Sequence, residues 1–128
     1  MIGLVDKITS DNSISWIHWL MLGLVLLGAA WLRYHLIDVP LERDEGEYAY
    51  GGQLLLQGVP PYKLLYNMKL PGIYAVYAAI LAVFGQTHSG IHLGLLFVTL
   101  FTILVIFFLG RMLIGATAAV AAAGAFAV

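Results

Sequence analysis

The sequence has no cysteine and few charged residues. Without cysteine, its 128 residues cannot form disulfide bonds or thiolate metal sites. Charged residues make up 10% of the chain and its formal net charge is −1, whereas an average soluble domain is about 25% charged. Such a small and nearly balanced charge argues against a nucleic-acid-binding protein, because those proteins present a basic face.

The sequence is instead rich in apolar residues. Hydrophobic residues account for 62% of the sequence. A soluble domain of this size cannot bury so many, because small domains expose a large share of their residues. The composition therefore excludes a soluble enzyme and a disordered chain. It predicts an all-α membrane protein, built as a polytopic bundle of transmembrane helices.

Three apolar segments are the first candidate spans. A spanning helix needs about 20 apolar residues, because the hydrocarbon core is about 30 Å thick. Residues 14–32 and 91–109 have nearly this length and contain no charged residue. Residues 71–85 are shorter and are expected to form a tilted or partly embedded span, with Pro71 in its first turn.

Residues 112–128 form a fourth candidate span, which is rich in alanine. Gly115, Ala119 and Ala123 are spaced four apart on one face, as in closely packed membrane helices. The apolar segment reaches Val128 without a cap or a polar tail. Natural helices usually end with such signals, so the sequence is expected to be the N-terminal part of a longer membrane protein.

Most of the charge lies in one long connection, residues 33–70, between the first two spans. Of the 13 charged residues, nine lie between Arg33 and Lys69. Connections of this length are usually functional. This one is also rich in leucine and tyrosine, which predicts short helices on the membrane surface.

One such helix is expected to begin at Asp44 and to end before Gly58, which two prolines follow closely. Its first acidic residues allow two interpretations. In the first, Asp44 is the N-cap of a capping box and Glu47 reaches back to it. In the second, Asp44 and Glu45 are candidate catalytic residues, as a general base or as ligands of a divalent metal ion.

Basic and aromatic side chains of the same connection favour the functional interpretation. Lys69 lies just before the second span, where its ammonium can neutralise a phosphate at the interface or extend towards the headgroups. Arg43 adjoins the acidic residues. With Tyr48 and Tyr66, these two cations are candidate substrate-binding residues for a lipid-linked phosphate.

Together these residues resemble a known family. Residues 43–50 (RDEGEYAY), 53–58 (QLLLQG) and 66–72 (YNMKLPG) are similar to the start of family 39 glycosyltransferases, which include aminoarabinose transferases and protein O-mannosyltransferases. The resemblance covers residues 38–85. It implies the GT-C fold, whose first external loop carries an acidic pair and short surface helices. It also implies transfer of a sugar from a polyprenyl-phosphate donor to a lipid, glycan or protein acceptor.

The resemblance further implies residue roles. Asp44 matches the acid that deprotonates the acceptor hydroxyl, and Glu45 matches its neighbour in the acidic pair. Lys69 matches the basic residue near the donor phosphate. Aminoarabinose transferases have a glutamate immediately before this lysine, where this chain has Met68 preceded by Asn67. The role of that glutamate therefore does not transfer to this chain.

The distribution of Lys and Arg and the family resemblance place the 33–70 connection on opposite sides of the membrane. Four of the six Lys and Arg residues lie in the 33–70 connection, which the positive-inside rule would place in the cytoplasm. The resemblance places it outside, at the bacterial inner membrane. We keep the second expectation because several of these cations are candidate functional residues.

Two other classes of protein compete with a glycosyltransferase. A small transporter subunit would need an ionisable group inside a span, but no acidic or basic residue lies in the middle of these spans. His18 and His35 are expected to be interfacial. A non-catalytic membrane assembly protein would use the long connection as a docking surface. Replacing Asp44 by asparagine separates these classes, because only the enzyme would lose glycosyl transfer.

Overall fold

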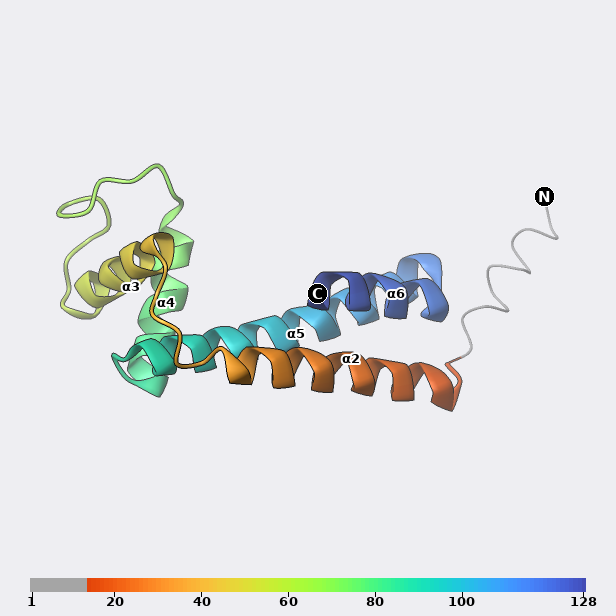
Figure 1. The fold of residues 1–128 in the computed structure, drawn as a ribbon. Coiled ribbons are helices and arrows are strands. Elements are labelled where there is room, and N and C mark those ends of the chain that lie inside the picture. The colour runs from red at the N-terminus through yellow and green to blue at the C-terminus, as the bar shows by residue number, and fades with distance from the viewer. Residues whose placement is uncertain (1–13) are drawn as a thin grey trace. The chain divides into compact units, whose positions relative to one another are not determined.

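A computed structural model describes residues 14–128, which form five α-helices and no strand (Figure 1). The predicted all-helical class is thereby confirmed for this part of the chain, and residues 1–13 of the predicted N-terminal part lie outside it. The helices are α2 (Trp16–His35), α3 (Arg43–Leu56), α4 (Pro71–Phe84), α5 (His88–Ile114) and α6 (Ala116–Ala127). The described residues belong to two compact units, residues 14–33 with 96–128 and residues 34–95.

Two helices in the described part of the chain are long and apolar enough to cross a membrane. They are α2, with 20 residues, and α5, with 27, and at about 1.5 Å per residue both reach the thickness of a hydrocarbon core. The apolar helices α4 and α6 have only 14 and 12 residues. Two of the four predicted spans therefore have the length to cross, and the four-span bundle stays a prediction.

The last two helices differ from the predicted boundaries at three points. α5 begins at His88 rather than at residue 91, because the Thr87 hydroxyl accepts a hydrogen bond from the Gly90 N–H at 3.0 Å and caps the helix. α5 also continues through residues 112–114, which the sequence predicts to be the start of the fourth span. The break comes at Gly115, whose φ of +96° is open to glycine but disfavoured for other residues.

In the first unit α2, α5 and α6 share a core of buried side chains, and the ribbon shows α2 and α6 beside α5 (Figure 1). Its buried side chains come from three helices: Leu22 and Ala29 of α2, Ile103 and Phe107 of α5, and Ala119, Val120 and Ala123 of α6. A Cβ added to Gly110 would lie 3.2 Å from the Ala119 Cα, so small residues let α5 and α6 approach closely. The predicted packing face through Ala119 and Ala123 is therefore confirmed, since both are fully buried.

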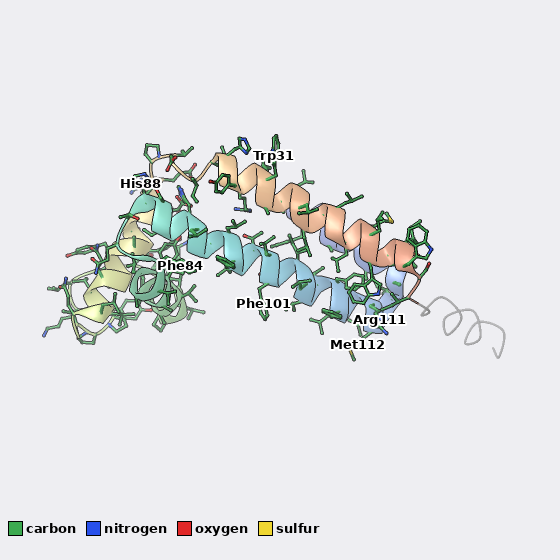
Figure 2. All side chains as sticks on the ribbon, turned by 90° about the horizontal axis from the view of Figure 1, so that it is seen from below. Trp31, Phe84, His88, Phe101, Arg111 and Met112 are labelled. Carbon is green, nitrogen blue, oxygen red and sulfur yellow. The ribbon has the colours of Figure 1, made fainter. Side chains whose placement is uncertain are left out.

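Large apolar side chains cover the outside of this unit. Trp31, Phe101 and Met112 project outward from their helices (Figure 2) and are 66%, 67% and 77% exposed. Only Leu22 and Ala29 of α2 are buried. A soluble domain rarely exposes so many large apolar side chains.

In the second unit α3 packs against α4. Two consecutive glycines of α3 make the contact possible. A Cβ on Gly51 would lie 2.4 Å from the Tyr74 ring, and one on Gly52 would lie 2.8 Å from the Ala78 backbone nitrogen. Buried side chains from α3, α4 and α5 complete this core: Ala49, Tyr77, Leu81 and Ile91.

The end of α3 and the start of α4 follow the sequence signals. Gly58 takes φ +78°. Its N–H donates to the Leu55 carbonyl at 3.0 Å, and the Val59 N–H donates to the Leu54 carbonyl at 2.9 Å. These two bonds form a Schellman motif, which terminates the helix. Pro71 occupies the first turn of α4, as predicted.

Candidate functional site

The start of α3 differs from the predicted capping box. Glu42, not Asp44, is the N-cap, and the helix begins at Arg43. The Glu42 N–H donates to the Glu45 carboxylate at 3.2 Å. The capping box with Asp44 and Glu47 is therefore wrong by two residues, and Glu45 is the acid that satisfies the helix terminus.

Glu45 has a second partner, which the sequence analysis missed. The Glu45 carboxylate lies 3.4 Å from His92 Nε2, and His92 Nδ1 lies 2.9 Å from the Ile37 carbonyl oxygen. Both partners of the imidazole are acceptors, so with Glu45 ionised both bonds form when the ring is protonated on each nitrogen. The one available signal was general: a polar residue near the start of an apolar helix needs a partner.

Asp44 lies in different surroundings from Glu45. Its side chain is exposed on the first turn of α3. Within residues 14–128 no side chain donates a hydrogen bond to its carboxylate. Its electrostatic influence reaches Lys69. The two neighbouring acids are thus separated: one stabilises the helix start, and the other remains available as a proton acceptor.

Lys69 lies beside α3. Its Nζ is 5.9 Å from the centre of the Tyr48 ring. Hydrogen bonding and charge interaction with the Tyr48 side chain raise the pKa of Lys69 above its ordinary value, and the carboxylates of Asp44 and Glu47 add to this effect. Lys69 therefore stays an ammonium at neutral pH. Three of the predicted site residues, Asp44, Tyr48 and Lys69, are brought together here.

The segment that carries Lys69 is held by side-chain contacts to α3, to α4 and within itself. The Asn67 amide donates a hydrogen bond to the Glu47 carboxylate. The Tyr62 hydroxyl donates to the Lys69 carbonyl oxygen, while its ring meets the edge of Tyr74 at 6.3 Å. The contacts to α3 and α4 could not be paired from the local sequence, because their partners lie on different elements.

Aromatic side chains of α4 form the floor of the site. The Tyr77 ring packs edge-on against Tyr48 with centres 5.6 Å apart. Tyr74 is 1% exposed, and no group in the described residues bonds its buried hydroxyl. The ring of Tyr48 therefore contacts both Tyr77 of α4 and the ammonium of Lys69.

The remaining predicted residues are not gathered at this point. Arg43 is exposed, and Tyr66 is 92% exposed. No group of three His, Asp or Glu side chains assembles in the described part of the chain to hold a metal ion. Asp44 and Glu45 remain candidate ligands without a set of partners around them.

The predicted interfacial histidine His18 belongs to the first unit and lies in a hydrogen-bonded position. Its Nδ1 accepts from the Ser15 N–H at 3.1 Å, and its Nε2 lies 3.3 Å from the Thr117 hydroxyl. With Nδ1 as acceptor, Nε2 carries the proton and donates to Thr117. His18 thus links α2 to the first turn of α6.

The site combines an exposed carboxylate with a nearby ammonium. A carboxylate can accept a proton from a hydroxyl group, and an ammonium stabilises negative charge that develops on a phosphate. Comparison with known proteins finds no match: no protein-family model, no curated protein and no solved structure is similar to this chain.

Proposed function

We propose that this chain is part of a membrane glycosyltransferase that takes a sugar from a polyprenyl-phosphate donor. The acceptor is a hydroxyl group of a lipid, glycan or protein at the outer face of the bacterial inner membrane. The observation that carries the proposal is the placement of Lys69 beside Tyr48, within the electrostatic reach of the free Asp44 carboxylate. The family resemblance supplies the reaction class.

Integration into a membrane is supported by α2. Its exposed apolar side chains recur every three or four positions along one face, at Trp16, Leu20, Leu24, Leu27 and Trp31. The two tryptophans are separated by 15 residues, or about 22 Å along the helix. Tryptophan is enriched at the two membrane interfaces, and a stripe of this kind suits lipid.

In the proposed reaction Asp44 and Lys69 have different roles. Asp44 accepts the proton of the acceptor hydroxyl, whose oxygen forms a bond with the anomeric carbon of the sugar. The bond from that carbon to the phosphate oxygen breaks, and the polyprenyl phosphate leaves with the electron pair. Lys69 stabilises the additional negative charge on the leaving phosphate. Arg43 and Tyr66 are exposed and are the further candidate contacts with substrate.

The base is tested by Asp44→Asn, which preserves shape and removes the proton acceptor. In the protein encoded by the whole reading frame, sugar transfer should fall by about 10²–10⁴-fold, which is the usual contribution of a general base. Binding of undecaprenyl phosphate should persist. Transfer at the unaltered rate, with normal expression, would overturn the assignment of Asp44.

The phosphate site is tested by binding of undecaprenyl phosphate to the chain in lipid nanodiscs. Lys69→Ala should abolish binding, and Lys63→Ala, in the same connection, should leave it unchanged. Undecaprenol, which lacks the phosphate, should not bind in either case. Equal binding of the two lipids would contradict the proposed donor class and favour a transporter subunit or an assembly protein.

A further inference from the structure

The segment between α3 and α4 contains no helix beyond the Schellman turn, yet Lys69 must be held at a fixed position to serve a phosphate. Its side chains alternate in exposure. Tyr66 and Met68 are 92% and 95% exposed, whereas Asn67 between them is turned inward and partly buried. Asn67 is the residue of this segment whose side chain bonds directly to α3, at Glu47.

The position of Asn67 fixes that of Lys69. In extended chain two residues span about 7 Å, so attachment of Asn67 to Glu47 limits the range over which Lys69 can move. Glu47 precedes Tyr48 on α3, and Tyr48 is the ring beneath the Lys69 ammonium. The attachment point and the position of the ammonium are therefore consecutive residues of one rigid helix.

The same hydrogen bond also affects the charge available at Lys69. The Glu47 carboxylate acts on the charge of Lys69 and would be a natural ion-pair partner for its ammonium. One Glu47 oxygen instead accepts from the neutral Asn67 amide, and Lys69 makes no ion pair within residues 14–128. The ammonium consequently keeps its capacity for an incoming phosphate.

We infer that Glu47 and Asn67 are a positioning pair, which holds Lys69 over Tyr48 and leaves its ammonium free for the phosphate of a polyprenyl-phosphate lipid. Neither residue touches the substrate. The inference deepens the proposed function and rests on it for the identity of the ligand, whereas the position of Lys69 is testable without any ligand.

The first test measures the position alone, by acetylation of lysines in the full chain in nanodiscs. Lys63 is the internal reference. Lys69 should react more slowly than Lys63, because Tyr48 raises the pKa of Lys69 and so lowers its fraction of free amine. Asn67→Leu should change this ratio, because it releases both Lys69 and the Glu47 carboxylate from their positions. Glu47→Gln, whose amide oxygen still accepts from Asn67, should change it less, because the Glu47 charge is the smallest contribution that raises the pKa of Lys69. An unchanged rate ratio in Asn67→Leu would overturn the positioning pair.

The second test adds undecaprenyl phosphate and measures protection of Lys69 from acetylation. Asn67→Leu should raise the lipid concentration needed for protection by about tenfold, the usual effect of losing one hydrogen bond to a charged group. Met68→Leu, on the exposed neighbour, should have no effect. A role in folding alone would lower the unfolding midpoint without changing this protection, which would also overturn the inference.

The two proposals fail in different ways. Absence of protection in the unaltered protein, with a rate ratio that still responds to Asn67→Leu, contradicts the proposed function and leaves the positioning pair intact. Protection that is equal in the unaltered protein and in Asn67→Leu contradicts the positioning pair alone. Asn67→Ala removes the same amide donor and provides the same test should the leucine variant not fold.

Discussion

Replacement of Gly52 by alanine should push α3 away from α4. The added Cβ would lie 2.8 Å from the backbone nitrogen of Ala78 and 3.0 Å from the backbone carbonyl carbon of Tyr77. Backbone atoms within a helix cannot turn aside as a flexible side chain can. Since ordinary contacts between such atoms are about 3.5 Å or longer, α3 must move locally by about 0.7 Å.

The size of the effect follows from two opposing contributions. Overpacking of this kind typically costs about 1–3 kcal/mol, whereas alanine stabilises a helix by about 0.5–1 kcal/mol relative to glycine. Gly46 lies on the same helix with no atom within 4 Å of an added Cβ. Gly46→Ala should therefore stabilise the helix without a steric clash. The opening free energies of the two variants should differ by the overpacking cost, about 1–3 kcal/mol.

Amide hydrogen exchange of α3, with the protein in nanodiscs, measures this local opening free energy directly. The amides of α3 should exchange about 5- to 150-fold faster in Gly52→Ala than in Gly46→Ala, which corresponds to that range of free energy. Equal protection in the two variants would refute the packing of α3 against α4. Faster exchange in Gly46→Ala than in Gly52→Ala would do so as well.

Two further substitutions test other parts of the fold. Phe107→Ala removes a fully buried ring from the core of the first unit and should lower the free energy of unfolding in an SDS titration by about 3–5 kcal/mol; Phe101→Ala, on the exposed face, should cost much less, and equal losses would contradict the assigned core. Gly58→Ala should destabilise the end of α3 by about 1–2 kcal/mol, because alanine is strained at φ +78°. Hydrogen exchange confined to the last turn of α3 measures this loss, and unchanged exchange there would argue against the Schellman motif.

Where a signal acts locally, the sequence was sufficient to place a helix end. Pro71 and Gly58 were both predicted correctly, because each restricts or permits a backbone conformation by its own chemistry. The break at Gly115 was placed incorrectly, although it is also a glycine. Gly94 and Gly110 lie inside α5 and do not interrupt it. A glycine in an apolar run thus marks a possible break, and packing decides which one is used.

The first turn of α3 was misplaced for a related reason. Glu42 and Glu45 have the same spacing as Asp44 and Glu47, so the capping pattern fits two registers, and aspartate is the better N-cap by statistical preference. The structure uses the earlier register, in which Leu41 packs against the core formed by α3 and α4. The start of α3 is therefore fixed by the packing of Leu41 against this core. The spacing of the acidic residues does not indicate this packing.

Pairings across long separations explain what the sequence missed in the site. Asn67 and Glu47 are 20 positions apart, and His92 and Glu45 are 47 positions apart. Neither pair has a periodic pattern to reveal it. Asp44, Tyr48 and Lys69 are predicted from the acidic, aromatic and basic side chains of one connection, and the resemblance adds roles for Asp44 and Lys69. The structure then places Lys69 beside Tyr48 and within electrostatic reach of Asp44.

The separation of Asp44 from Glu45 has a geometric cause with a chemical consequence. Consecutive residues of an α-helix point about 100° apart, so adjacent carboxylates on one helix cannot converge on the same atom. One member of the acidic pair is therefore free to serve the helix terminus and His92, while the charge of the other acts on Lys69. In the proposed reaction Asp44 acts as a single base, and Glu45 contributes by fixing the turn on which that base stands. An acidic pair at the start of a helix can thus combine one structural and one chemical role, with the order along the chain determining which residue has each.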